Sequence, residues 1–215
     1  MNIVSDEFCI VVQNNVTAEI TLTLLSEKSH IQIYSHNNVD LTVRVIILFP
    51  EVVDLQISVF LCGEQSRVNV LGMYALAQMQ SVEVVTQQFH CGRNNYSRLI
   101  LQGLLIGQSK VKHNGTIKIE KNASGTYALQ NNKNILLSNK SSAISIPNIE
   151  VLNHDVQCFH GACVGKFGQK EMQYMQSRGL SDGIIKQLLV EALFSDVLFN
   201  YENKNLILKK VYEEI

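Results

Sequence analysis

The sequence predicts a mainly β chain, a β-solenoid, that ends in a short α-helical region. Short segments of alternating apolar and polar residues follow one another over residues 18–156, and comparable segments begin at nearly constant intervals. From about residue 168 onward, apolar residues recur instead at helical spacing. We therefore expect a β core over residues 1–167 and a helical region over residues 168–215. A β-sandwich remains the alternative, because alternation alone does not separate the two architectures.

Alternation of apolar and polar residues is typical of a strand with one buried face. The clearest expected strands are 19–24, 30–34, 40–45, 54–59, 67–70, 81–84 and 115–120. Short polar breaks rich in Asn and Gly separate such segments, and these residues tolerate the left-handed backbone of tight corners. The expected breaks are 14–15, 36–38, 62–65, 92–95, 122–125 and 131–132.

A faint repeat supports stacking of these strands. Leu41, Leu55, Val68 and Val82 open comparable strands at separations of 14, 13 and 14 residues. Two such units make a rung of roughly 25–30 residues, which is the scale of a solenoid repeat. The prolines, Pro50 and Pro147, lie at the edges of strand-like runs, as expected in sheets.

The C-terminal region predicts two helices. Residues 169–178 form the first, and Gly179 is a natural stop just beyond it. Ser181 or Asp182 then caps a second helix with a broad apolar stripe. The stripe comprises Ile184, Ile185, Leu188, Leu189, Ala192, Leu193, Val197 and Leu198. We expect it to pack against the end of the solenoid or against a partner.

Composition narrows the class of protein. The 215 residues carry 18 Lys and Arg against 19 Asp and Glu, so no basic excess predicts nucleic-acid binding. No apolar run approaches the roughly 20 residues of a membrane span, and residues 1–12 lack the basic start of a secretory signal. Five cysteines without framework spacing indicate reduced thiols. We therefore expect a soluble cytoplasmic protein, or one of a plastid-like organelle.

Residues 158–165, Cys-Phe-His-Gly-Ala-Cys-Val-Gly, are the most informative segment. In a strand, Cys158 and His160 point to the same face, where a thiolate and an imidazole can hold iron, zinc or copper(I). Two ligands do not close a metal site, so something else must complete it. Cys163 is a weaker third candidate, expected to be a buried core thiol rather than a ligand.

The remaining cysteines suggest less chemistry. His90 and Cys91 are adjacent in a strand and point to opposite faces, so we expect no joint site there. Cys9 and Cys62 have no sequence partners and are expected to be core or surface thiols. The sequence also lacks a phosphate-binding G-x-x-x-x-G-K-[ST] loop, a G-x-S-x-G elbow and an H-E-x-x-H helix. The chain is therefore not expected to hydrolyse ATP through such a loop, and it shows neither of these two hydrolase motifs.

The C-terminal third resembles the SufB/SufD family of iron–sulfur cluster assembly scaffolds, and most closely the SufD type. The resemblance is clear over about residues 147–200. It is carried by segments 147–151 and 155–158, by His160-Gly161-Ala162 and Val164-Gly165, and by Tyr174 with Ser177-Arg178-Gly179-Leu180. Gly161, Gly165, Arg178 and Gly179 are its structural motif positions.

The resemblance implies a right-handed parallel β-helix followed by C-terminal helices. It implies a SufB-type partner joined through the β-helices and a SufC-type ATPase docked on the helical region, with Ile184, Ile185, Leu188, Leu189 and Leu193 as docking candidates. It also implies a non-enzymatic scaffold, on which a transient iron–sulfur cluster would form near the SufB interface, where His160 would face a cysteine of the partner. A separate desulfurase system would deliver sulfur to that partner.

The sequence departs from the family pattern in two ways. Beside that pattern, we expect the family's N-terminal helical region to be missing or reduced to residues 1–12, and Cys163 stands where threonine is usual in the family. If the partner is absent, we expect self-association, for instance as a homodimer, because open solenoid ends need covering.

Two other functions fit the pattern less well. One is a purely structural solenoid homologue with inert thiols. The other is a β-helix carbohydrate-active enzyme, which requires clustered carboxylates. The candidates for that role, Glu19, Asp40, Asp54 and Glu83, look scattered along the sequence.

Overall fold

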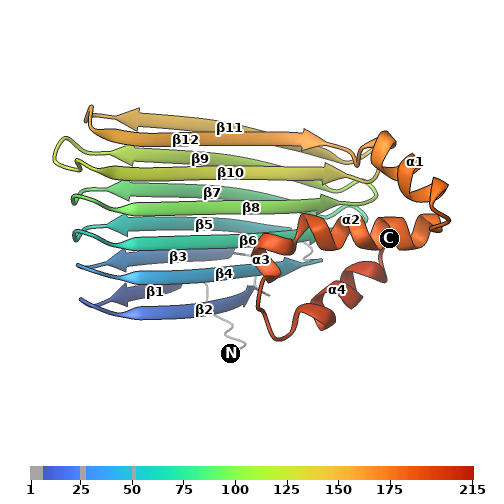
Figure 1. Cartoon of the computed structure of the whole chain (residues 1–215), viewed down its shortest axis with the longest axis horizontal. Coiled ribbons are helices and arrows are strands. Elements are labelled where there is room, and N and C mark those ends of the chain that lie inside the picture. The colour runs from blue at the N-terminus through green and yellow to red at the C-terminus, as the bar shows by residue number, and fades with distance from the viewer. Residues whose placement is uncertain (1–6, 25–27, 50–51) are drawn as a thin grey trace.

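The computed structural model describes residues 7–24, 28–49 and 52–215, and it forms a parallel β-helix with helices along one flank (Figure 1). The strands are β1 Glu7–Val12, β2 Thr17–Leu24, β3 Lys28–Ser35, β4 Asp40–Leu48, β5 Val52–Leu61, β6 Arg67–Leu76, β7 Ser81–His90, β8 Tyr96–Leu105, β9 Lys110–Ile119, β10 Thr126–Leu136, β11 Ser142–Val151 and β12 Val156–Gly165. The predicted solenoid is confirmed. Pro50 lies outside the described residues.

The strands build two parallel sheets, one on each side of the β-helix. Odd-numbered strands form one 6-stranded sheet in the order β1-β3-β5-β7-β9-β11, and even-numbered strands form the other. Each successive pair of strands is one rung, so Asp40 pairs with Arg67 and Asp54 with Glu83 on the next rung. These offsets confirm the predicted rung of about 25–30 residues. The strand-opening residues Leu41, Leu55, Val68 and Val82 alternate between the two sheets.

The interior changes character along the axis. Early rungs are filled by aliphatic side chains such as Ile31, Val43 and Ile57, all fully buried. Later rungs bury polar side chains instead, among them Gln88, His90, His113, Gln130, Asn132 and Asn134.

The alternation of β10 continues through 131–132, so the predicted break there is wrong. The amides are accommodated in the interior by hydrogen bonds: Asn132 Nδ2 donates to Tyr74 Oη of an earlier rung at 3.1 Å, and Asn134 Nδ2 donates to Asn132 Oδ1 at 2.7 Å.

The other five predicted breaks are turns. On one side of the β-helix, Asn15, Asn38, Gln65, Asn94 and Gly125 take left-handed backbone conformations on successive rungs. Their N–H groups donate to carbonyls of the next rung, for example Asn38 N to Glu64 O at 2.9 Å. Asn, Gln and Gly at these positions thus let the corners stack in register.

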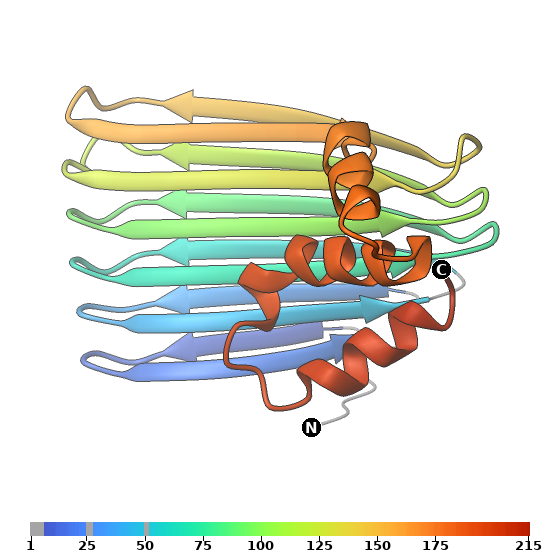
Figure 2. The same cartoon turned by 45° about the vertical axis from the view of Figure 1, so that its right-hand side comes forward.

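Helices cover the outer face of the even-numbered sheet (Figure 2). They are α1 Gln169–Ser177, α2 Asp182–Leu193, α3 Ser195–Leu198 and α4 Lys204–Tyr212. Gly179 ends the first helix with φ +86°, and Ser181 is the N-cap of α2, as predicted. Helix α4, which the sequence pattern did not reveal, buries Ile207, Leu208 and Val211.

The apolar stripe packs on the flank of the sheet, not on the end of the solenoid. Val190, Phe194 and Val197 pack in one cluster with the outward-facing Ile46, Leu71, Met73 and Ile100 of the strands. Strands β4, β6 and β8 are consequently buried on both faces over their C-terminal halves. This contact, which a local pattern does not reveal, selects which side of α2 is inside.

The five docking candidates on α2 separate into two groups. Ile185 and Leu193 are buried, at 0% and 4% exposure, and Leu189 is half-buried. Ile184 and Leu188 are 47% and 45% exposed on the other side of the helix. The sequence stripe also missed Val190, which is fully buried. Only Ile184, Leu188 and part of Leu189 remain accessible to a partner.

Arg44 of β4 fastens the helices to the sheet. Its Nε donates to Val197 O and its Nη2 to Phe199 O, both at 2.9 Å, and it forms an ion pair with Glu19. The acceptors lie at the C-terminal end of α3, where backbone carbonyls lack partners and a cation is favoured.

Within the described residues, no helix is both long enough and apolar enough to cross a membrane.

Candidate functional site at the open end of the β-helix

The last rung, formed by β11 and β12, is open on one side. β11 pairs with β9 and β12 pairs with β10, and within the described residues no strand lies beyond either (Figure 1). Inward-facing Ile149, Val151 and Val164 are therefore exposed, although their counterparts on earlier rungs are buried. Pro147 lies in the middle of β11 and not at the end of a strand as the sequence suggested, and its missing N–H is tolerated because β11 is an edge strand. Such an edge is a ready surface for another strand.

Cys158 and His160 lie on the same face of β12, as predicted. They stand in register with Ala128 and Gln130, which are both fully buried in the interior of the preceding rung. Cys158 packs beside Ala128 and the apolar cluster of Ile117 and Ile119. The pair therefore points into the β-helix at its open end, and both residues are half-buried.

The imidazole of His160 is enclosed but unpartnered. Neither Nδ1 nor Nε2 has a hydrogen-bond partner among the described residues, although both atoms are shielded from solvent. Burial lowers the pKa of His160, which favours the neutral ring with a free lone pair. A buried polar group without a partner requires an explanation, and a ligand that binds at this end provides one.

A hydrogen-bonded layer lies beneath this ring. His113 Nε2 lies 2.9 Å from Thr86 Oγ1, and its Nδ1 lies 3.2 Å from Ser145 Oγ. Gln130 Nε2 also donates to Thr86 Oγ1. Burial, and secondarily the proximity of His160, lowers the pKa of His113 to about 4. Both nitrogens of His113 are thus engaged, whereas those of His160 are available.

The thiol of Cys158 is less ready to react. Burial raises the pKa of Cys158, so it carries its proton at neutral pH. Binding of a metal at this sulfur would have to displace that proton, because only the thiolate is a ligand. His160 is therefore the primary ligand candidate and Cys158 the secondary one.

Cys163 does not belong to this pair. It is exposed and stands in register with Lys133 on the outer face of the sheet, so the expectation of a buried core thiol is wrong. The reason is the alternation of side chains along a strand: the inward-facing positions of β12 are even-numbered, so the odd-numbered Cys163 points outward. The segment thus offers two inward ligands, not three.

The motif glycines and Arg178 have structural surroundings. A Cβ at Gly161 would lie 3.2 Å from Asn131 Oδ1 on the outer face, whereas a Cβ at Gly165 would meet nothing within 4 Å. The guanidinium of Arg178 stacks over the ring of Tyr174 at 5.2 Å. Among the residues that the structure describes, no three His, Cys, Asp or Glu side chains converge as a metal site.

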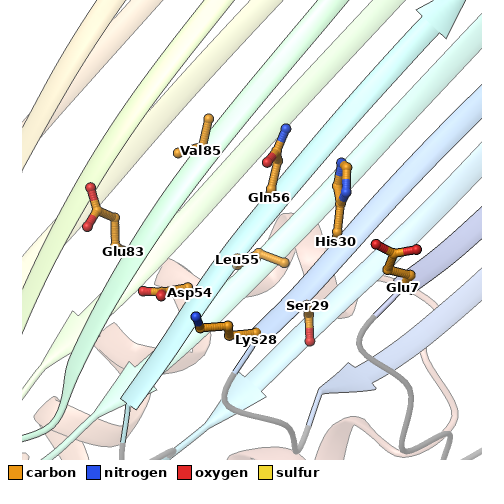
Figure 3. Close-up of a pocket in the computed structure, with 9 residues that line it drawn as sticks. All are labelled: Glu7, Lys28, Ser29, His30, Asp54, Leu55, Gln56, Glu83 and Val85. Carbon is orange, nitrogen blue, oxygen red and sulfur yellow. The ribbon is translucent and has the colours of Figure 1, made fainter.

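A pocket on the outer face of the odd-numbered sheet gathers charged side chains (Figure 3). Asp54 and Glu83, which look scattered in the sequence, lie one rung apart in direct register. Lys28 and Lys112 continue the same column on either side, and Lys112 Nζ contacts Glu83 Oε1 at 2.8 Å. The carboxylates thus belong to a ladder with equal numbers of positive and negative groups. Glu19, by contrast, pairs with Arg44 on the other sheet.

Comparison with known proteins matches most of the chain to one family. Residues 25–193 match the family described as "SUF system FeS cluster assembly, SufBD core domain". The SufBD family protein ycf24 of the alga Galdieria sulphuraria is 26% identical over 140 residues, covering 65% of this chain and 63% of the relative.

Two longer relatives match over a similar stretch. A SufBD family protein of Synechocystis is 26% identical over 141 residues, covering 66% of this chain and 29% of its own length. The chloroplastic SufBD family protein ABCI8 of Arabidopsis thaliana is 26% identical over 140 residues, covering 65% and 25%. The chain thus spans less than two thirds of the length of these relatives.

Proposed function

Because the chain belongs to the SufBD family of iron–sulfur cluster assembly proteins, we propose that it is a SufD-like scaffold subunit. A nascent cluster would be built at its open end and then passed on. In this role the chain binds and releases its cargo without being an enzyme, and it works in the cytoplasm or in a plastid-like organelle.

The observation that carries the proposal is the enclosed, unpartnered imidazole of His160 on the last rung. A neutral imidazole is a good ligand for iron, and it leaves the metal on protonation more readily than a thiolate does. Cys158, on the same face, is the secondary ligand. A cluster intended for transfer should not be fully caged, and this pair leaves most of the coordination sphere to another molecule.

The free edges of β11 and β12 indicate where that molecule would bind. A SufB-type partner that extends both sheets would cover Ile149, Val151 and Val164 and would place its own thiolates and carboxylates near His160. Burial of this end would also exclude water from the cluster. A second copy of this chain could cover the same edges when the partner is absent.

The accessible side of α2 is the proposed dock for a SufC-type ATPase. Ile184 and Leu188 are one helical turn apart and exposed, while the other side of the helix is held against the sheet. Movements of a docked ATPase would reach the β-helix through α2 and the Arg44 contacts. Ile185 and Leu193 are buried in the fold and are not part of this dock.

The proposal is tested by co-purification with the SufB- and SufC-type proteins of the same organism, followed by anaerobic iron and sulfide analysis. We expect wild type to form the complex and gain iron and sulfide, and His160→Ala to form the complex without them. His154→Ala, an exposed histidine of the same rung, is the matched control and should behave like wild type.

A complex that accumulates iron and sulfide regardless of His160 would contradict the ligand role and leave a structural subunit. For the dock, Ile184→Asp with Leu188→Asp should abolish co-purification of the ATPase while the SufB-type partner remains bound. Leu206→Asp, on the exposed side of α4, should retain the ATPase. Equal retention by both variants would refute the assigned dock.

A further inference from the structure

A second pair of thiols lies at a corner of the β-helix, away from the proposed cluster site. Cys62 and Cys91 each follow directly after a strand, β5 and β7, on neighbouring rungs. Their N–H groups make the same ladder hydrogen bond, Cys62 to Ser35 O and Cys91 to Leu61 O, both at 3.2 Å. The two residues therefore occupy equivalent positions one rung apart, although 28 residues separate them in the sequence.

The side chains of the pair point the same way. Two residues earlier on the same strands, Phe60 and Phe89 stack with their ring centroids 4.9 Å apart and their planes 8° from parallel. Alternate residues share a face, so Cys62 and Cys91 continue this outer column at the strand spacing of about 4.8 Å. Both thiols are exposed, and both line one shallow hollow at the corner.

The corner holds this spacing tightly. The glycine after each cysteine packs against the preceding turn: a Cβ at Gly92 would lie 1.9 Å from Gly63 O, and a Cβ at Gly63 would lie 2.2 Å from the carbonyl carbon of His36. The turns are therefore stacked backbone on backbone. The backbones of the two cysteines are therefore held at the spacing of neighbouring rungs.

We propose that Cys62 and Cys91 form a two-thiolate site for one soft, monovalent d¹⁰ cation, Cu(I) being the best fit. Metal–thiolate bonds of about 2.3 Å on opposite sides of an ion span about 4.6 Å, close to the strand spacing. Thiolate ligands select Cu(I) over harder ions. A disulfide requires its two Cβ atoms to lie about 3.5–4.5 Å apart, which is closer than the strand spacing of about 4.8 Å, so a pair bridged by a metal ion suits the column better.

Binding releases both thiol protons as two metal–sulfur bonds form, and no electron is transferred. Burial raises the pKa of both thiols, and Cys62 and Glu120 add to the effect at Cys91 while Lys118 opposes it. Both sulfurs are thus protonated at neutral pH. The affinity should rise about 100-fold per pH unit in this range, because two protons leave for each ion bound.

The test is an anaerobic titration of the reduced full chain with Cu(I) in competition with bicinchoninate. We expect Cys62→Ser and Cys91→Ser each to lose the same one equivalent of Cu(I), since either change removes half of the pair. Cys9→Ser, which replaces an exposed cysteine outside this column, should keep that equivalent. X-ray absorption of the Cys158→Ser chain loaded with one equivalent of Cu(I) should show two sulfur neighbours per copper.

The inference is overturned if either serine variant at the corner retains the full stoichiometry, or if Cys9→Ser loses the same equivalent. Copper with one sulfur neighbour in the Cys158→Ser background would also overturn it. The titration does not depend on His160, so its outcome is separate from that of the proposed cluster site.

Discussion

Buried histidines in the later rungs depend on hydroxyl partners. His90 Nε2 lies 2.8 Å from Ser97 Oγ, and His113 lies between Thr86 and Ser145. Burial is the main cause that lowers the pKa of each ring to about 4. Both are therefore neutral in the folded protein at any pH where the unfolded chain begins to protonate them, which links stability to pH.

We predict that the free energy of unfolding falls as the pH falls from about 6.5 toward 4. Between these values the unfolded chain binds more protons than the folded one. The stability that the two neutral rings contribute is therefore fully present above about pH 6.5 and is lost progressively as the pH falls toward 4. From pH 7 to pH 5 the loss should be about 2 kcal/mol for each of His90 and His113. Urea unfolding measured at several pH values checks this.

Two substitutions test the origin of this pH dependence: one replaces a buried ring, and the other replaces an exposed ring as the control. His113→Gln should remove about half of this pH dependence of the unfolding free energy, because His90 still titrates, whatever the change does to the stability at pH 7. His36→Gln should leave the slope unchanged. An unchanged slope in His113→Gln would show that this ring is not the group being titrated.

At the scale of the element, the turns hold the rungs in register through close backbone contact. Gly92 illustrates this, because its Cα faces the carbonyl of Gly63 on the preceding turn. We predict that Gly92→Ala lowers the free energy of unfolding by about 1–3 kcal/mol, since the added methyl group meets backbone that cannot rotate away. Gly165→Ala, where a Cβ would meet nothing within 4 Å, should be close to neutral in the same urea experiment.

The helices depend on one buried side chain of the sheet. Replacing Arg44 with Met keeps the aliphatic stem but removes two charge-assisted hydrogen bonds to Val197 O and Phe199 O. We predict that this change lowers the free energy of unfolding by about 2–4 kcal/mol and speeds proteolysis between α3 and α4. Arg93→Met, at an exposed turn, is the comparison. Equal protease resistance in both variants would refute the anchoring role.

At the scale of the whole molecule, the β-helix ends in an uncovered rung. Burying Ile149 and Val151 against a second copy would remove apolar surface from water and pair the free strand edges. We predict concentration-dependent dimers of the isolated chain in sedimentation velocity. Ile149→Asp should weaken them at least tenfold, whereas Met79→Asp, an exposed apolar side chain at a turn, should not. A monomer at every concentration would contradict this use of the open end.

The sequence alone predicted much of this architecture, because its signals are local. Period-2 alternation reports which face of a strand is inside, so the β core and the shared face of Cys158 and His160 followed from it, whereas the choice of a solenoid over a sandwich depended on the faint repeat. The spacing of Leu41 and Val68 reported the rung length, and Gly179 and Ser181 marked helix boundaries. These features depend on residues close together in the chain.

Only the tertiary structure decided what lies across from what. The register between rungs depends on the length and conformation of every turn, so the pairing of Asp54 with Glu83 and the alignment of Cys62 with Cys91 were not visible in the sequence. The buried position of Asn132 and the buried side of α2 likewise depend on distant partners, Tyr74 and the outer face of the sheet. A repeating fold brings residues about one rung apart into contact, and such contacts carry no local pattern.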